Sequence, residues 1–308
     1  MLLNKLLEEY LEYLEIEKGR SIKTAENYQH YLRRFFDWTK IKKPEEITDE
    51  TVRKYRIYLN RYKGENGRDL KKVTQNYHII AIRNFLKYLA KRDIPCLQAE
   101  KIEVGKSIAP SVEFLEPGEV ERILEAAAGG VLKNIRDRSI LELLYSSGLR
   151  VSELTSLNRD QLNLKTQEFS VRGKGGKLRV VFISESAKKA LENYLEKRGD
   201  IDPALFVRVP KKGGQMVKSK KGDLRMTPRS IQRIVKYYAM KAGIVKDVHP
   251  HTFRHSFATD LLINGADIRS VQAMLGHSSI TTTQIYTHIT NQQLREVHKA
   301  FHGRRRRK

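Results

Sequence analysis

The segment His249-Pro-His-Thr-Phe-Arg-His255 is the densest concentration of chemically capable side chains in the sequence. Within a helix, His251 and Arg254 stand three residues apart and share one face. An imidazole and a guanidinium on one face can reach the same anion, and a guanidinium binds an oxyanion through parallel hydrogen bonds. The segment therefore indicates an anion-binding site.

Two other interpretations apply to this segment when it is taken alone. Closely spaced histidines can bind zinc, but the metalloprotease pattern H-E-x-x-H needs a glutamate that is absent here, and no cysteine ligand accompanies the histidines. The histidines could also be ordinary core or surface side chains. We expect no metal site. Whether these histidines belong to an anion-binding site or are ordinary core or surface side chains depends on the motifs elsewhere in the chain.

A histidine and a tyrosine follow this segment in the sequence, and their spacing is informative. His277 lies 23 residues after Arg254, and Tyr286 follows nine residues later. On one continuous helix, nine residues would place His277 and Tyr286 on opposite faces. Gly276 favours the end of a helix and Ser278 the start of another, so the two side chains can converge from successive elements.

Two basic residues upstream complete the set. Arg150 follows a glycine at a predicted corner between two helices, and Lys174 lies at the tip of a predicted hairpin, Gly173-Lys-Gly-Gly-Lys177. A nucleotide-binding loop would require G-x-x-x-x-G-K-[ST] at the start of a helix, whereas a strand-like segment follows this loop. We therefore expect no nucleotide cofactor.

The first part of the chain predicts a small helical domain over residues 1–95. Apolar residues recur at helical spacing in four segments. Thr48 is suited to cap the third of them, and a proline at position 44 disfavours helix before it. The four predicted helices cover residues 2–17, 21 to about 41, 49–62 and about 71–92.

The second part predicts a larger domain over residues 113–302, after a linker at 96–112 framed by Pro95 and Pro110. Helical spacing returns from Pro117, and an alternating pattern on either side of the loop at 173–177 predicts a β-hairpin. This domain should be mainly helical with a small antiparallel sheet. Its further helices are predicted at 134–147, 184–197, 228–242 and repeatedly towards the C-terminus.

Charge points to a polyanionic partner. The 308 residues include 59 Lys and Arg against 36 Asp and Glu, a net charge of +23, and residues 106–308 carry +17 of it. The single cysteine, Cys96, cannot form an internal disulfide, which agrees with a reducing compartment. Apolar stretches are too short to span a membrane and no signal segment is evident, so we expect a soluble, cytoplasmic protein.

Four segments in order resemble the tyrosine recombinase (phage integrase) family, and within it the Xer site-specific recombinases. The resemblance covers essentially the whole chain and implies an N-terminal SAM-like core-binding domain and a catalytic domain of the DNA breaking-rejoining fold. It implies DNA cleavage and rejoining through a 3′-phosphotyrosine, without metal or nucleotide cofactor. The matching segments are GLRVSELTSL, GKGGKLRVV, HPHTFRHSFAT and LGHSSITTTQIYTHI.

The resemblance assigns three residues to the phosphate. Arg150 and Arg254 match the two phosphate-clamping arginines of the family, whose fork geometry suits the charge that develops on phosphorus. His277 matches the position that donates a hydrogen bond to a phosphate oxygen.

It assigns three others to nucleophile and proton transfer. Tyr286 matches the nucleophile, His251 the residue that exchanges a proton with it, and Lys174 a general acid for the leaving 5′-hydroxyl. A phenol with an ordinary pKa near ~10 is mostly protonated at neutral pH, so it needs a base and a cationic cluster nearby.

The resemblance also implies partners. Double-stranded DNA and other recombinase protomers, identical or paralogous, would assemble as a tetramer on two sites, with the amphipathic helix expected at 291–301 exchanged between protomers and a septal DNA translocase as a further partner. Folding of that helix onto its own domain is the alternative. We hypothesise that the run Thr281-Thr282-Thr283 is marginally ordered, so that a neighbour's helix controls Tyr286. The basic tail at 303–308 suits phosphate contact.

The sequence is compatible with more than one biological task. Xer likeness favours chromosome dimer resolution, whereas a basic insert at 207–226 departs from the Xer pattern and leaves a plasmid or mobile-element integrase as the alternative. A type IB topoisomerase would share the tyrosine chemistry but work as a monomer. A non-catalytic DNA-binding regulator would not need all six site residues.

Overall fold

The structure is a computed structural model, and it describes residues 2–64, 67–105, 113–173, 176–209, 224–277, 279, 280, 283 and 286. The chain divides into two compact units, Met1–Pro110 and Ser111–Lys308. Several predicted features lie outside the described residues: Lys174, the middle of the basic insert, Thr281 and Thr282, the helix expected at 291–301 and the basic tail.

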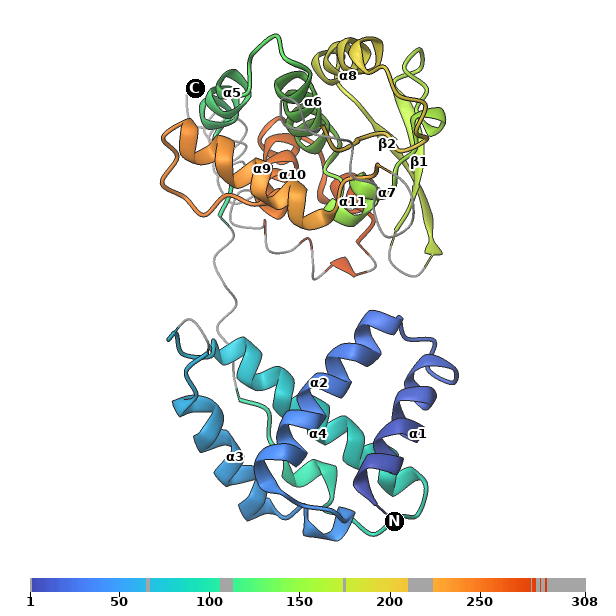
Figure 1. The fold of residues 1–308 in the computed structure, drawn as a ribbon, viewed down its shortest axis with the longest axis vertical. Coiled ribbons are helices and arrows are strands. Elements are labelled where there is room, and N and C mark those ends of the chain that lie inside the picture. The colour runs from blue at the N-terminus through green and yellow to red at the C-terminus, as the bar shows by residue number, and fades with distance from the viewer. Residues whose placement is uncertain are drawn as a thin grey trace, which may run out of the picture. The chain divides into compact units, whose positions relative to one another are not determined.

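The described residues of the first unit form four α-helices, as the apolar spacing predicts (Figure 1). Ser21 caps the second helix by accepting a hydrogen bond from the backbone N–H of Thr24 at 3.3 Å, and Thr48 caps the third in the same way. The helices are α1 (Leu3–Glu15), α2 (Ile22–Thr39), α3 (Asp49–Arg61) and α4 (Lys72–Lys91), with short 3-10 turns η1 (Pro44–Glu46) and η2 (Ala99–Lys101).

The core of the first unit is rich in aromatic side chains, and it extends beyond the last helix. Tyr10, Phe35, Tyr55 and Phe85 are fully buried between the helices. Ala99 and Ile102 are buried in the same core, so the first half of the linker expected at 96–112 packs with the first unit. The extension has a simple cause, since these apolar side chains find partners in that core and would be exposed in a free linker.

The second unit is mainly helical, with one small sheet among its described residues, which confirms the predicted fold class. Its central helix is α6 (Leu132–Ser147), buried on nearly every side and packed against α8 and α10 (Figure 1). The other elements are α5 (Pro117–Ala126), α7 (Val151–Ser156), η3 (Arg159–Gln161), α8 (Glu185–Lys197), α9 (Pro228–Lys241), α10 (Pro250–Ile263) and α11 (Ile268–Leu275).

The sheet is the predicted antiparallel hairpin of β1 (Glu168–Arg172) and β2 (Leu178–Phe182). Phe169 pairs with Val181 and Val171 pairs with Arg179, and these four side chains face the protein. The described ends of the basic insert also pair, through an antiparallel bridge between Val207 and Arg225, so the insert leaves and re-enters the domain at one place.

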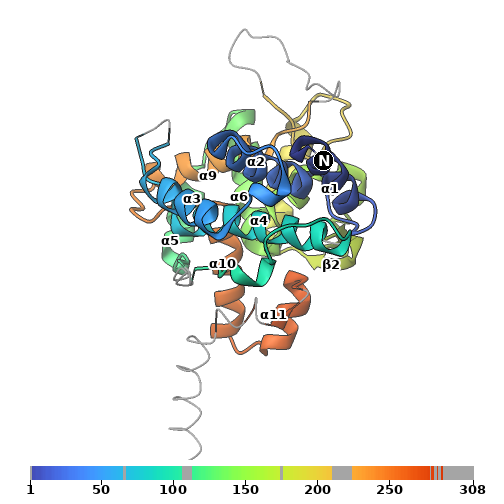
Figure 2. The ribbon, with the colours of Figure 1, turned by 90° about the horizontal axis from the view of Figure 1, so that it is seen from below.

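Helices α10 and α11 lie side by side (Figure 2). Gly276 ends α11 with φ of +63°, a left-handed conformation that favours glycine, and this confirms the helix end predicted there. Gly148 ends α6 in the same way, with φ of +58°, and so creates the predicted corner before α7. Among the described residues, no helix is long and apolar enough to cross a bilayer.

Candidate active site

Helix α10 carries the first part of the site. His249 caps it, since its Nδ1 accepts the backbone N–H of Thr252 at 3.1 Å, and Pro250 occupies the first helical position, where a missing N–H costs nothing. Arg254 is 4% exposed and points away from solvent, whereas His251 is exposed. Partial desolvation, then His249, Arg254 and Arg150, lowers the pKa of His251, so its imidazole is neutral and able to accept a proton at neutral pH.

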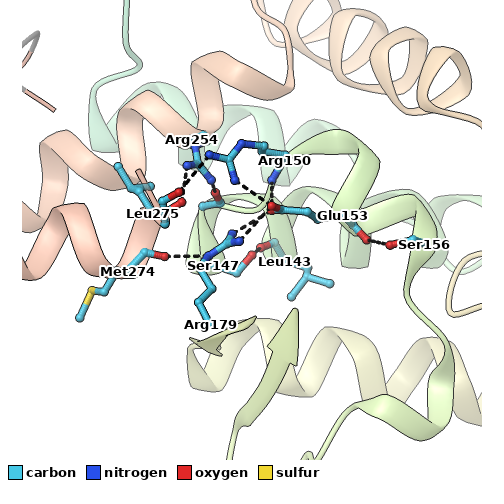
Figure 3. A network of polar contacts seen from close by, with 11 residues as sticks. Leu143, Ser147, Arg150, Glu153, Ser156, Arg179, Arg254, Met274 and Leu275 are labelled. Atoms are coloured by element: carbon cyan, nitrogen blue, oxygen red, sulfur yellow. Dashed lines mark hydrogen bonds and ion pairs between the residues drawn. The ribbon is translucent and has the colours of Figure 1, made fainter. Parts of the chain in front are cut away.

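Arg150 begins helix α7 and is fixed by Glu153. The Glu153 carboxylate accepts the Arg150 backbone N–H and its Nη1, each at 2.8 Å. The same carboxylate accepts two further bonds from Arg179 on strand β2, at 2.9 and 2.8 Å (Figure 3). Burial opposes ionisation of Glu153, but the bonds from Arg179 and Arg150 outweigh it and lower the carboxyl pKa to about 2.

The carboxyl end of helix α11 draws three arginines together. The carbonyl of Met274 accepts Arg179 Nε at 3.0 Å, that of Leu275 accepts Arg254 Nη2 at 2.6 Å, and that of Gly276 accepts Arg150 Nη2 at 3.4 Å (Figure 3). The last carbonyls of a helix have no partner within it and carry partial negative charge, which suits cations.

The site remains electropositive around this helix end. The Glu153 carboxylate binds the guanidinium groups of Arg150 and Arg179 but not that of Arg254. Burial, followed by Arg150, lowers the pKa of Arg254 to about 9. Burial and the neighbouring Arg150 both disfavour the charged form of Arg254, so a nearby anion would be stabilising. An incoming phosphate would supply that negative charge, so the arrangement is suited to a phosphodiester.

His277 follows directly on the α11 end. Its Nδ1 lies 3.0 Å from Thr283 Oγ1, and its backbone N–H bonds to Gln272 O at 3.2 Å. Burial, then Arg254 and Arg150, lowers the pKa of His277 to about 4. His277 is therefore neutral at physiological pH, and one ring nitrogen can donate to a phosphate oxygen.

Tyr286 lies beside the arginines but is enclosed. Its side chain is 1% exposed and packs against α10 and α11, and its hydroxyl lies 2.6 Å from Nδ1 of His255. Burial raises the pKa of Tyr286 to about 12, against the opposing effect of Arg254. Burial also lowers the pKa of His255 to about 4, so the hydrogen bond joins a neutral phenol and a neutral imidazole.

Comparison with known proteins decides the family. The phage integrase family model matches residues 113–293, and the model of its N-terminal SAM-like domain matches residues 7–93. The chain belongs to the phage integrase family. The resemblance inferred from the four sequence segments is thus confirmed, and so is the SAM-like character of the first helical unit.

The curated relatives narrow this to the Xer-like tyrosine recombinases. A tyrosine recombinase XerD from Listeria monocytogenes serotype 4b is 35% identical over 306 residues, covering 98% of this chain and 100% of the relative. A tyrosine recombinase XerC from Thermodesulfovibrio yellowstonii is 35% identical and covers 95% of this chain and 94% of the relative. The chain is a tyrosine site-specific recombinase.

Solved structures agree. The structure of XerA recombinase is similar with a TM-score of 0.51 at 32% identity, covering 96% of this chain and 98% of that one. The Tn1549 transposon integrase, solved with transposon right end DNA, is similar with a TM-score of 0.73 at 20% identity, covering 98% and 99%. This second likeness shows the fold alone.

Of the six site residues predicted for this recombinase, five are described. Arg150, Arg254 and His277 meet at the end of α11, and Tyr286 is linked to them through His255, the neighbour of Arg254. His251 lies one turn before His255 on α10. The sixth, Lys174, lies outside the described residues. In the sequence it falls between β1 and β2, which are both described and paired.

Three residues at this site were missed by sequence reasoning: Glu153, Arg179 and His255. Glu153 gave a usable signal, since an acid three residues after an arginine at a helix start is placed to bond back to it. His255 lies inside the segment that drew attention first. Among the described residues, no group of three or more His, Cys, Asp or Glu side chains is placed to hold a metal ion.

Proposed function

We propose that this recombinase cleaves and rejoins DNA with Tyr286 as the nucleophile and Arg150, Lys174, His251, Arg254 and His277 as the residues that bind the phosphate and move protons. One observation supports the proposal most directly: Arg150, Arg254 and His277 meet at the end of α11. The Tyr286 hydroxyl lies close to them, because it bonds to His255, the residue after Arg254 on α10. An electropositive phosphate site beside a phenol is what phosphotyrosine chemistry requires.

The proposed reaction balances without another reactant. Tyr286 Oη forms a bond to the scissile phosphorus, its proton passes to His251, and the bond from phosphorus to the 5′ oxygen breaks. Lys174 protonates the departing 5′ oxygen. The phosphotyrosine bond keeps the energy of the phosphodiester, and attack by a 5′-hydroxyl of another strand reverses the step and completes strand exchange.

The arginines act where charge develops. Arg150 keeps 24% of its side chain exposed, whereas Arg254 is 4% exposed and is held by the carbonyls of Gly148 and Leu275. Forked donors held in advance stabilise a pentacoordinate phosphate more than the ground state, because they need no reorganisation as charge builds up.

In this state Tyr286 is not ready to react. A side chain that is 1% exposed and bonded to His255 has to turn outwards before its oxygen can meet a phosphate. The proposed trigger is exchange of the terminal helix at 291–301 with another protomer in a tetramer on two DNA sites. This fits the position of Tyr286 just before that segment in the sequence.

The proposed task is Xer-like chromosome dimer resolution in the cytoplasm, with a septal DNA translocase as a further partner. Support comes from similarity over almost the full length to recombinases named XerD and XerC. The net charge of +23 supports double-stranded DNA as the substrate.

The decisive experiment traps the covalent intermediate. Sites are first selected from sheared genomic DNA of the source organism by repeated binding to the protein. The selected duplex is then nicked at successive positions, so that a short 5′-hydroxyl fragment diffuses away after cleavage. We expect a protein–DNA adduct with the wild type and none with Tyr286→Phe, while duplex binding stays equal. An adduct with Tyr286→Phe would overturn the assignment of the nucleophile.

A further inference from the structure

Arg179 occupies an unexpected face of the hairpin. Strand β2 alternates as Leu178-Arg-Val-Val-Phe182, and its apolar residues 178, 180 and 182 would ordinarily face the core. The structure has the opposite arrangement. Leu178, Val180 and Phe182 are 67%, 46% and 54% exposed, whereas the Arg179 side chain is 9% exposed. The inward face of the strand also carries Val181, which is buried, but it places an arginine there while three large apolar side chains are exposed. The buried arginine therefore needs a specific reason.

The contacts of Arg179 supply that reason. Its Nη1 and Nη2 donate to the two oxygens of Glu153 on α7, at 2.9 and 2.8 Å, and its Nε donates to Met274 O at the end of α11, at 3.0 Å (Figure 3). One side chain therefore joins three elements that are far apart in sequence. A forked guanidinium makes this set of bonds, and the single ammonium of a lysine does not.

Each joined element bears a proposed site residue. Glu153 fixes the backbone and the guanidinium of Arg150. The α11 end leads directly into His277, and the hairpin that carries Arg179 carries Lys174 in its loop. We propose that Arg179 is a positioning residue: it holds Arg150, the turn before His277 and the hairpin that carries Lys174 in fixed positions relative to one another. This inference rests on the proposed function.

Arg179 does not itself have the position of a phosphate ligand. Three of its N–H groups are engaged by protein oxygens and its side chain is more enclosed than that of Arg150, which is 24% exposed. The close approach of Gly276 also fixes it, since a Cβ at Gly276 would lie 2.8 Å from Arg179 Cδ. The role of Arg179 is therefore exerted through Glu153 and through the α11 end.

Arg198 provides a matched control. Its guanidinium is likewise buried, donating to the carboxylate of Asp200 and to the carbonyls of Ala204 and Leu205 at 2.6 and 2.9 Å. It contacts none of the five described site residues. Arg198→Met thus removes the same kind of buried guanidinium and should lower stability, but it should leave the cleavage rate of the folded fraction unchanged.

The test compares single-turnover cleavage and duplex affinity on the trapping substrate. For Arg179→Met we expect the cleavage rate at saturating protein to fall on the order of 100-fold, with the Kd for the duplex within about threefold of wild type, because misplacement of catalytic groups affects the chemical step. Arg179→Lys should recover only part of the rate, since it restores charge without the fork. Thermal melting gives the folded fraction of each variant.

A double-mutant cycle tests the route of the effect. If Arg179 acts on Arg150 through Glu153, Arg179→Met combined with Glu153→Gln should cleave no more slowly than the slower single variant, because both changes break the same connection. Fully additive losses would overturn this route.

Two further outcomes separate the inference from the proposed function. No adduct with the wild type would overturn the proposed function, and the inference with it. A wild-type adduct together with an unchanged rate in Arg179→Met, or an equal loss in Arg198→Met, would overturn the inference alone.

Discussion

The hydroxyl of Tyr286 bonds to His255, whereas family resemblance assigns its proton to His251. Both histidines lie on α10, one turn apart, so they can serve different stages. His255 satisfies the phenol while it is enclosed, and His251, which is exposed, is placed to act once the phenol has turned towards a phosphate. An enclosed hydroxyl without a partner would cost about 1–3 kcal/mol, which explains why a histidine is present there.

A double-mutant cycle on the unfolding free energy measures this contact. Tyr286→Phe and His255→Phe each remove one partner of the 2.6 Å bond while keeping an aromatic ring. We expect a coupling energy of about 1 kcal/mol between them in urea unfolding of the protein without DNA. The control pair, Tyr286→Phe with His251→Phe, should show coupling near zero, and a reversed ranking of the two pairs would contradict the assignment of His255.

At the scale of elements, the end of α11 organises the site. Three successive carbonyls are each taken by a different arginine, so the position of the helix end sets the position of the cations. Gly276 makes this possible in two ways, by adopting φ of +63° and by leaving room for Arg179.

Replacing this glycine should therefore have two separable effects. Gly276→Ala places a Cβ 2.8 Å from Arg179 Cδ as well as straining the backbone, whereas Gly243→Ala strains a similar backbone, φ of +70°, with nothing within 4 Å. We expect Gly243→Ala to cost about 1 kcal/mol of unfolding free energy and Gly276→Ala about 1–3 kcal/mol more.

Cleavage should distinguish the same two variants. Gly276→Ala displaces Arg179 and should slow single-turnover cleavage, while Gly243→Ala, at the end of α9, should cleave at the wild-type rate. Equal cleavage by both would show that the α11 end does not control the site.

The helices and strands could be predicted from the sequence. The contacts between them could be predicted only in part. Helical spacing placed α1, α3 and α6 within two residues of their ends, and Gly276 marked the end of α11. The alternation in 178–182 predicted a strand but not which face is buried, because Glu153 is 26 residues away in sequence and alternation carries no information about it. The three carbonyl anchors are likewise products of tertiary packing.

At the scale of the whole molecule, the net charge of +23 predicts strongly salt-dependent binding. Each phosphate neutralised should contribute about −0.9 to the slope of log K against log salt concentration. Replacing Arg304–Lys308 with serines should make the slope shallower by about 0.9 for each phosphate the tail contacts. An unchanged slope in a filter-binding or anisotropy titration would exclude the tail from phosphate contact.

Acid should destabilise the folded chain in two successive pH ranges. Burial lowers the pKa of His78 in the first unit, and of His255 and His277 in the second, to about 4. Between pH 6.5 and 4 the unfolded chain binds protons at these histidines and the folded chain does not. Their contribution to stability is therefore complete above pH 6.5 and is lost as the pH falls towards 4.

Glu153 acts in a lower range. Its pKa of about 2 lies below the ordinary carboxyl value of 4.5, so its contribution is present above pH 4.5 and is lost as the pH falls towards 2. Urea unfolding between pH 7.5 and 5.5 should therefore report mainly the histidines, with a slope of at most about 1.4 kcal/mol per pH unit for each one. His255→Phe should flatten the slope for the second unit and leave that for the first unit unchanged, because His78 titrates in the other core. Equal unfolding free energies at pH 7.5 and 5 would contradict the burial of these three imidazoles as neutral groups.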